Sequence, residues 1–190
     1  MTFSRGIVII LLGFIFFPLL SCEKRINCDN ELTLQLKEML QTGTLEDVII
    51  SYSWTGGYGP GNVYVTLRSN GNSSVRLDPI IGESSEVEAE IDKERFSSLV
   101  YKIARRGFLC LESIPREVCI ADVGKYSVTT QTGLLSKEII ADGEYYLKYD
   151  DIFIDVLEAI HDFEEVFEIN LLEWGPYGTA TIPCPEKESI

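Results

Sequence analysis

The clearest pattern along the chain is a strict alternation of apolar and polar positions on either side of Asn70-Gly71. This period of two is typical of strands that bury one face. Asn70-Gly71 favours a type I′ turn, in which both central residues have positive φ. The pattern therefore predicts a β-hairpin with one apolar face. Its apolar positions are Val63, Val65, Leu67, Val75 and Leu77.

Other segments also read as strands. Residues 46–54 are rich in β-branched and aromatic side chains, and residues 87–91 alternate after a loop rich in Gly, Ser and Glu. Residues 125–131 and 134–141 flank Thr132-Gly133, a sequence that turns the chain back. These two runs predict a second hairpin.

Two longer segments repeat their apolar residues at helical spacing. Residues 92–106 begin with Asp92, a good N-cap, and end at Gly107, so they predict an amphipathic helix. Residues 150–167 predict a second helix with an acidic outer face. Residues 29–41 also fit a helix capped by Asp29 or Asn30, but the alternation of their leucines leaves a strand open. The expected fold class is α+β: an antiparallel sheet built from β-hairpins, with two amphipathic helices packed on one face. We expect residues 32–190 to form one globular domain.

The N-terminus has a different character. Arg5 precedes an uncharged apolar run over residues 6–20, the pattern of a secretory signal. The run ends Leu19-Leu20-Ser21-Cys22, which resembles the lipobox of bacterial lipoproteins, although Leu20 is bulkier than the usual residue there. The resemblance implies that residues 1–21 are a signal peptide, that Cys22 is lipidated with fatty acyl groups such as palmitate, and that residues 22–31 form a lipidated tether. The protein would then be lipid-anchored to a membrane of the bacterial cell envelope. An uncleaved membrane anchor and an ordinary signal with a free Cys22 stay open.

Composition and charge narrow the choice of partner. The 190 residues are 45% hydrophobic and 24% charged, which excludes a disordered tail, a collagen-like repeat and a polytopic membrane protein. Acidic residues outnumber basic ones 30 to 16, giving a formal charge of −14. We therefore expect no nucleic-acid partner, because phosphates favour a basic surface. An acidic domain is also repelled by anionic lipid, so it should stand off the bilayer.

The chain has five cysteines, and an exported compartment permits disulfides. With Cys22 lipidated, we expect Cys110–Cys119, which closes a short loop, and by elimination Cys28–Cys184. We expect no metal site and no cofactor, because the cysteines lack C-x-x-C spacing and His161 is the only histidine.

The sequence offers few candidates for chemistry. Aromatic residues in two glycine-rich loops form a candidate binding patch, although we favour core packing for them; they are Trp54, Tyr58, Trp174 and Tyr177. The carboxylates near His161 in sequence (Glu158, Glu164 and Glu165) would raise its pKa, but a solvated surface histidine explains the same pattern. The acidic residues of 150–165 are interpreted as a solvated helix face. The chain has no Walker loop, nucleophile elbow or EF-hand pattern, and we assign no catalytic residue.

The folded part resembles the small lipoproteins of unassigned function that are common in bacteria. The leading hypothesis is a noncatalytic, envelope-anchored module that binds or supports another macromolecule, such as a protein with a basic surface. One alternative is an inhibitor or immunity-type protein against a basic envelope enzyme. Others are a carboxylate-dependent glycan hydrolase and a small-ligand binder.

Overall fold

The structure is a computed structural model that describes residues 28–56, 61–112, 120–121, 124–142, 151–169 and 180–181. Its helices are α1 (Glu31–Thr42), α2 (Lys93–Arg106), the 3-10 turn η1 (Phe108–Cys110), α3 (Asp151–His161) and α4 (Glu164–Phe167). Its strands are β1 (Val48–Thr55), β2 (Gly61–Arg68), β3 (Asn72–Pro79), β4 (Ser85–Glu90), β5 (Ile120–Ala121), β6 (Lys125–Thr132), β7 (Leu135–Asp142) and β8 (Ala180–Thr181).

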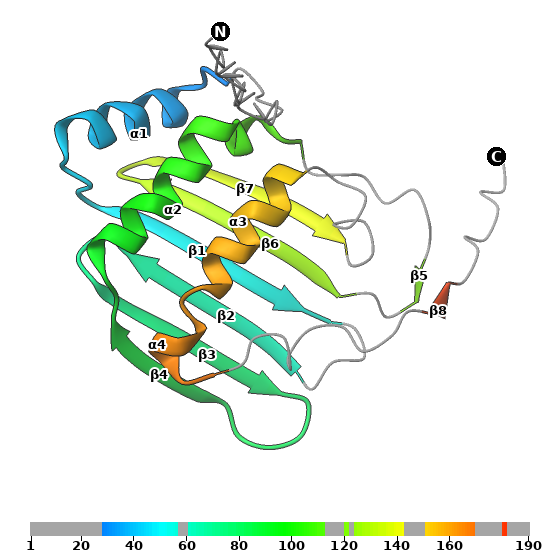
Figure 1. The fold of residues 1–190 in the computed structure, drawn as a ribbon. Coiled ribbons are helices and arrows are strands. Elements are labelled where there is room, and N and C mark those ends of the chain that lie inside the picture. The colour runs from blue at the N-terminus through cyan, green and yellow to red at the C-terminus, as the bar shows by residue number, and fades with distance from the viewer. Residues whose placement is uncertain are drawn as a thin grey trace, which may run out of the picture.

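Six strands form one antiparallel sheet in the order β4-β3-β2-β1-β6-β7 (Figure 1). The first four strands follow one another as a meander. After α2, the chain returns to the other side of β1, where β6 and β7 form the second predicted hairpin. The short strands β5 and β8 pair separately.

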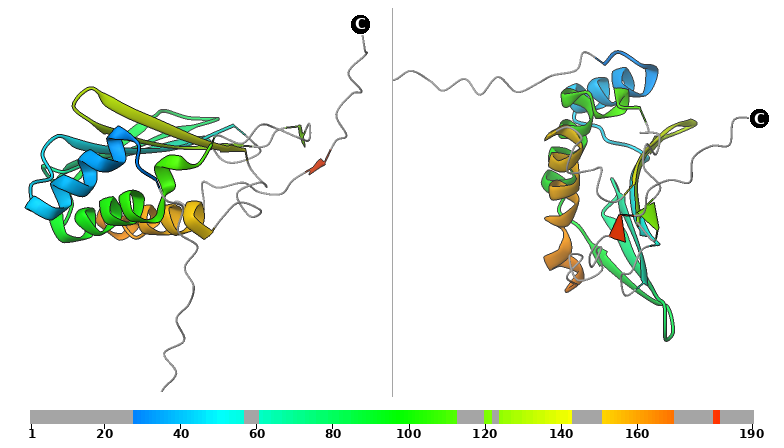
Figure 2. Two further views of the ribbon diagram at one scale, coloured as in Figure 1. Left: turned by 90° about the horizontal axis from the view of Figure 1, so that it is seen from above. Right: turned by 90° about the vertical axis from the view of Figure 1, so that its right-hand side faces the viewer.

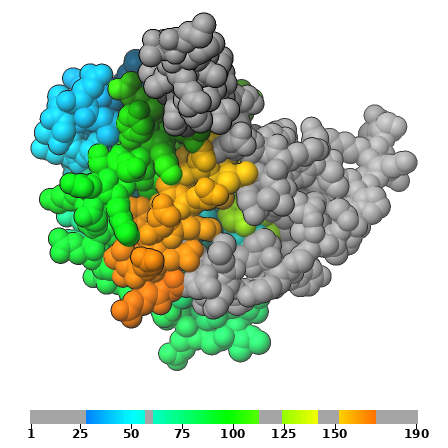
Figure 3. Space-filling view, viewed as in Figure 1, coloured from blue at the N-terminus to red at the C-terminus, as the bar shows by residue number. Residues whose placement is uncertain are grey.

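The sheet and the helices form two layers. Every second residue of β1 and β2 is buried, as alternation predicts for strands covered on one face. Figure 2 shows α1, α2 and α3 together on one side of the sheet, with no described helix on the other side, and in the view of Figure 3 these helices lie in front of the strands. The core lies between the layers and includes Ile50, Leu67, Phe96, Ile103 and Ile139. The α+β fold class is confirmed.

The helices differ from the expectation in number and length. Residues 29–41 form helix α1, so the strand alternative is wrong, and three helices rather than two cover the sheet. The segment 150–167 is not one helix, because it breaks at Asp162–Phe163 before the short α4. The predicted caps of α2 are confirmed: the Asp92 carboxylate accepts hydrogen bonds from the amides of Glu94 and Arg95, and Gly107 takes the left-handed conformation.

The turn between β2 and β3 corrects one prediction. The amide of Gly71 donates to the Arg68 carbonyl at 3.0 Å, so the turn begins at Arg68. Gly71 has φ +95°, whereas Asn70 is not among the residues with positive φ. The turn is therefore not type I′. It is a three-residue connection that ends in a left-handed glycine, a common alternative in hairpins.

Candidate functional site

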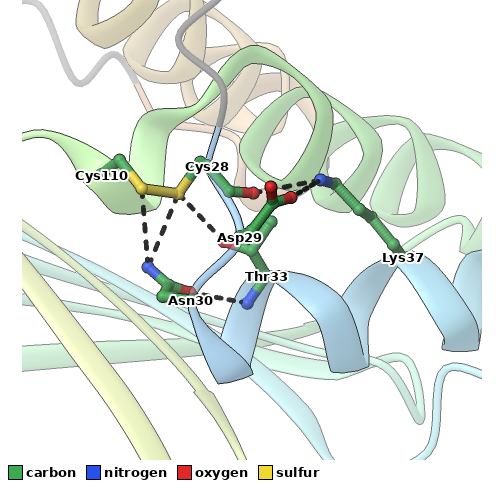
Figure 4. Close-up of polar contacts among 6 residues, drawn as sticks. All are labelled: Cys28, Asp29, Asn30, Thr33, Lys37 and Cys110. Carbon is green, nitrogen blue, oxygen red and sulfur yellow. Dashed lines mark hydrogen bonds and ion pairs between the residues drawn. A yellow bond between two sulfur atoms is a disulfide. The ribbon is translucent and has the colours of Figure 1, made fainter.

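A disulfide ties the start of the described chain to its middle. Cys28 bonds to Cys110 with a Cα–Cα distance of 5.5 Å, across 82 residues of sequence (Figure 4). Cys28 immediately precedes α1, and Cys110 ends η1, which follows α2. Cys28 is only 2% exposed, so it already belongs to the core rather than to a free tether.

This bond overturns the expected pairing of the cysteines. Cys110 does not pair with Cys119, and Cys28 does not pair with Cys184. The expectation used proximity along the chain, whereas the packing of α1 against α2 brings residues 82 positions apart together. Cys119 and Cys184 themselves lie outside the described residues.

Asn30 joins three parts of this junction. Its Oδ1 accepts a hydrogen bond from the Thr33 amide at 2.8 Å, which caps α1. Its Nδ2 donates to the Leu109 carbonyl of η1 at 2.9 Å. The Thr33 hydroxyl lies 3.3 Å from the sulfur of Cys28, which carries no proton in a disulfide, so the hydroxyl is the donor. One short segment therefore starts a helix, binds η1 and surrounds the disulfide (Figure 4).

Lys37 holds the same segment from one turn further along α1. Its Nζ donates to the Cys28 carbonyl at 3.1 Å and lies 3.4 Å from the Asp29 carboxylate. The chain at Cys28 is therefore fixed to the core by a covalent bond and by these polar contacts.

Of the four residues in the candidate aromatic binding patch, the structure describes only Trp54, and it does not place Trp54 on the surface. Trp54 is 1% exposed, and its ring centroid lies 4.4 Å from that of Tyr126 on the neighbouring strand β6. Trp54 therefore packs in the core. Tyr58, Trp174 and Tyr177 lie outside the described residues.

His161 is also more buried than the acidic segment around it suggested. Its side chain is 25% exposed and lies edge-on to the ring of Tyr52, with centroids 5.9 Å apart. Burial lowers its pKa below the ordinary 6.5, although the charge of Asp162 acts in the opposite direction. Its Nε2 is buried without a hydrogen-bond partner, so a proton there would be an unpaired buried donor. Neither interpretation of the sequence holds: the pKa is lowered rather than raised, because desolvation outweighs the charge of Asp162, and the side chain is largely buried rather than solvated.

Several hollows open on the described part of the surface, and two of them lie beside His161 and at the start of α2. One, of about 410 Å³, lies between α2 and the α3–α4 break and is lined by His161 and Arg95, whose Nη1 donates to the Asp162 carbonyl at 3.4 Å. The other, of about 570 Å³, lies where α1, β1 and the start of α2 meet. Arg68 and Lys93 line it together with Glu46 and Asp47, so its charges are mixed and select no ligand class.

The uncovered face of the sheet is polar. Hydroxyl side chains stand opposite one another across three strands, with Ser51 of β1 between Thr66 and Thr129, and Ser53 between Tyr64 and Ser127. This face offers many hydrogen-bonding groups and few apolar ones.

The loop between β3 and β4 (residues 80–84, the β3–β4 loop) has the opposite character. Ile80 is 69% and Ile81 is 91% exposed. From the sequence alone, this segment is interpreted only as a loop rich in Gly, Ser and Glu. The two adjacent isoleucines between Pro79 and Gly82 do not fit a pattern of alternating apolar and polar positions. They are the feature of the sequence that marks this loop as unusual.

Two further properties hold for the described part of the chain. No group of three or more His, Cys, Asp or Glu side chains there is arranged to hold a metal ion. None of its helices has the length and apolar character needed to cross a membrane. The apolar run of residues 6–20 lies outside it.

No family model matches the chain, and no curated protein matches it significantly.

Proposed function

We propose that this protein is an envelope lipoprotein, anchored through Cys22, whose folded domain is a noncatalytic module that binds another macromolecule. The Cys28–Cys110 disulfide is the observation that carries the proposal. Disulfides persist in exported proteins and are rare in reducing compartments. The bond therefore agrees with the export that the N-terminal sequence implies.

The position of the disulfide also suits an anchored domain. Cys28 lies six residues after Cys22, and six residues span at most about 20 Å when fully extended. The domain would be kept close to the membrane surface. The disulfide, Asn30 and Lys37 fix the point where the tether enters the fold.

Charge favours a domain that faces away from the lipid. Residues 22–190 carry a formal charge of −15, because Arg5 is the only charged residue in the signal segment. Anionic lipid repels such a domain, and a basic protein partner attracts it. The polar sheet face and the exposed β3–β4 loop are the surfaces it offers to a partner.

The anchor is tested by fractionation of cells that express the full chain. Cys22→Ser removes the lipidation site, and Asn27→Ser is a control that changes the same short segment but leaves the lipobox intact. We expect the wild type and the control to stay with membranes through high-salt and carbonate washes, and the Cys22→Ser protein not to be processed to the anchored form. Processing of Cys22→Ser, together with retention through both washes, would contradict the proposal.

The binding role is tested by affinity capture from envelope extract with the detergent-solubilised full chain. We expect at least one envelope protein with a basic surface to be retained at low salt and released at high salt, since screening weakens charge-driven contacts. Capture that is unchanged by salt, or no capture above a bare-resin control, would count against a charge-guided binding module.

A further inference from the structure

The β3–β4 hairpin end (residues 76–87) carries several exposed aliphatic side chains. Six large apolar side chains are exposed in the described part of the chain, and three of them are here: Ile80, Ile81 and Val87. Val87 is 38% exposed on the edge strand β4, three residues past the loop that carries the two isoleucines. Single exposed aliphatics are ordinary on a protein surface, whereas two adjacent isoleucines exposed in one loop indicate contact with a partner.

The loop is held in one shape from its base. Asp78 receives a bidentate hydrogen bond from Arg76, with Nε 3.0 Å from Oδ1 and Nη2 2.6 Å from Oδ2. Ser84, on the other side of the loop, also donates to this carboxylate, and the two donors together lower its pKa. The Arg76 guanidinium lies 4.7 Å from the ring centroid of Tyr64 on β2. These contacts link both ends of the loop to the sheet.

Two glycines permit the geometry of the loop and its base. Gly82, within the loop, has φ +121°, a conformation that other residues rarely adopt. A Cβ on Gly61 would overlap the backbone of Asp78 and lie 2.6 Å from the Cα of Pro79, so the end of β3, from which the loop starts, is set closely against β2. A loop that is fixed before binding loses little conformational entropy when it binds.

Charge defines the surroundings of the isoleucines. Three acidic residues lie near the isoleucines, Asp78, Glu83 and Glu86, against one cation, Arg76, which is paired with Asp78. Glu88 and Glu90 lie further along β4, and Glu90 stands opposite Asn72 at the other end of the hairpin. A lipid surface is a poor match, because anionic headgroups repel these carboxylates. A protein recess that is apolar at its centre and rimmed by Lys and Arg matches both the aliphatic tip and its acidic border.

The hairpin end also lies far from the tether entry. The sheet order puts β4 and β7 at opposite edges, and α1 packs on the β7 side. Figure 1 accordingly shows α1 at one end of the molecule and the β3–β4 loop at the other. An anchored domain would present this loop away from its point of attachment.

From these observations we propose that the β3–β4 loop is the element that enters the partner, with Ile80 and Ile81 filling an apolar recess of a protein whose rim is basic. The inference rests on the proposed function and names its contact surface and the kind of partner. It favours an inhibitor-like mode, in which a preformed loop occupies a cleft.

The experiment begins with a photo-crosslinking amino acid in the full-length protein in cells, at Ile81 or at Leu134. Leu134 is a matched control, because it is fully exposed in the tip of the β6–β7 hairpin. The protein crosslinked at position 81 is identified and purified. Its binding to the detergent-solubilised full chain is then measured for the wild type, the double variant Ile80→Ser/Ile81→Ser and Leu134→Ser.

We expect crosslinking at 81 and not at 134, affinity about tenfold or more weaker for the double variant, and affinity within about twofold of wild type for Leu134→Ser. Binding should also weaken as salt rises. The variants change exposed side chains, and equal thermal midpoints for all three proteins check that they fold alike. Unchanged affinity of the double variant overturns the inference, as does crosslinking to lipid alone.

Flotation with phosphatidylethanolamine/phosphatidylglycerol vesicles tests the lipid alternative, using residues 22–190 with Cys22→Ser, which lack both the apolar segment of residues 6–20 and the acyl chains. Flotation that depends on Ile80 and Ile81 overturns the inference, because it would make the loop a membrane-insertion element. A partner that crosslinks at position 134 and binds the double variant with wild-type affinity would contradict this inference alone. It would still agree with the proposed function. No envelope partner at any position contradicts both.

Discussion

Gly124 packs against the indole ring of Trp54 so closely that no side chain fits between them. A Cβ at Gly124 would overlap three ring carbons of the tryptophan. Gly124 is buried immediately before β6, and Trp54 ends the buried row of β1 beside Tyr126. The absence of a side chain at position 124 therefore sets the position of the largest side chain in the core.

Gly124→Ala is expected to lower the free energy of unfolding by about 1–3 kcal/mol, because it overpacks a filled core. Urea denaturation measures the change. Lys125→Ala, at the exposed neighbouring position, should stay within about 0.5 kcal/mol of wild type. The cost of Gly124→Ala should shrink in a Trp54→Leu background, where the ring is gone. Equal costs in the two backgrounds would show that the indole is not the obstacle.

Removing the Cys28–Cys110 disulfide with the double substitution Cys28→Ala/Cys110→Ala should lower the free energy of unfolding by about 2–5 kcal/mol. The bond closes a loop of 82 residues, and a long loop loses much unfolded-state entropy when it is cross-linked. Denaturation of the wild type with and without reductant should show at least this loss, because reductant opens the Cys28–Cys110 bond together with any bond between Cys119 and Cys184. If neither the double substitution nor the reductant changes the free energy of unfolding, the Cys28–Cys110 bond does not form in the protein.

The two remaining cysteines are expected to pair with each other. With Cys28 bonded to Cys110 and Cys22 lipidated, only Cys119 and Cys184 are left. Cys119 directly precedes β5 in sequence and Cys184 follows β8 by three residues, and Ile120 of β5 pairs with Thr181 of β8. Non-reducing peptide mapping should recover a Cys119–Cys184 crosslinked peptide. Two alkylated, unpaired peptides would refute the pairing.

His161 should make stability depend on pH. Because burial lowers its pKa in the folded state, the unfolded chain takes up this proton at a higher pH than the folded one. The contribution is therefore present above the unfolded pKa of about 6.5 and is lost as pH falls from there toward the lowered folded pKa. The groups around the imidazole are Tyr52, Asp162 and Glu164, whose Oε1 lies 3.7 Å from Nδ1.

Urea midpoints at about pH 7.5 and 5.5 test this. The wild type should lose more stability between these values than His161→Gln, which has no titrating group there. Glu165→Gln serves as a control for the general charge of the segment and should keep the wild-type pH dependence. Identical pH dependence of the wild type and His161→Gln would assign the effect to other groups.

Local patterns predicted most of the elements. The alternation of apolar and polar positions predicted the hairpins. The apolar residues at helical spacing in residues 92–106, with caps at Asp92 and Gly107, predicted the bounds of α2 to within one residue. These features depend on neighbours in sequence, so the sequence contains them. The turn at Asn70-Gly71 was predicted less well, because the choice between turn types depends on strand register, which Asn-Gly alone does not determine.

The candidate sites depend on contacts between residues that are far apart in the sequence. Local sequence patterns do not predict such contacts. Cys28 meets Cys110 only because α1 packs beside α2, and Trp54 is buried only because β6 places Gly124 and Tyr126 against it. His161 looked solvated because its sequence neighbours are acidic, whereas its pKa is set by burial near Tyr52 on β1. These differences between the prediction and the structure have one cause: tertiary packing decides which side chains are buried and which cysteines meet.

Mass spectrometry of the mature N-terminal peptide tests the central claim, lipid anchoring at Cys22, most directly. The protein is purified from the membrane fraction without reductant, and its N-terminal peptide is sequenced with its modification intact. The account predicts a chain that begins at Cys22, with the mass of a thioether-linked diacylglyceryl group on its sulfur. An unmodified Cys22, or a mature chain that retains residues 1–21, would contradict it.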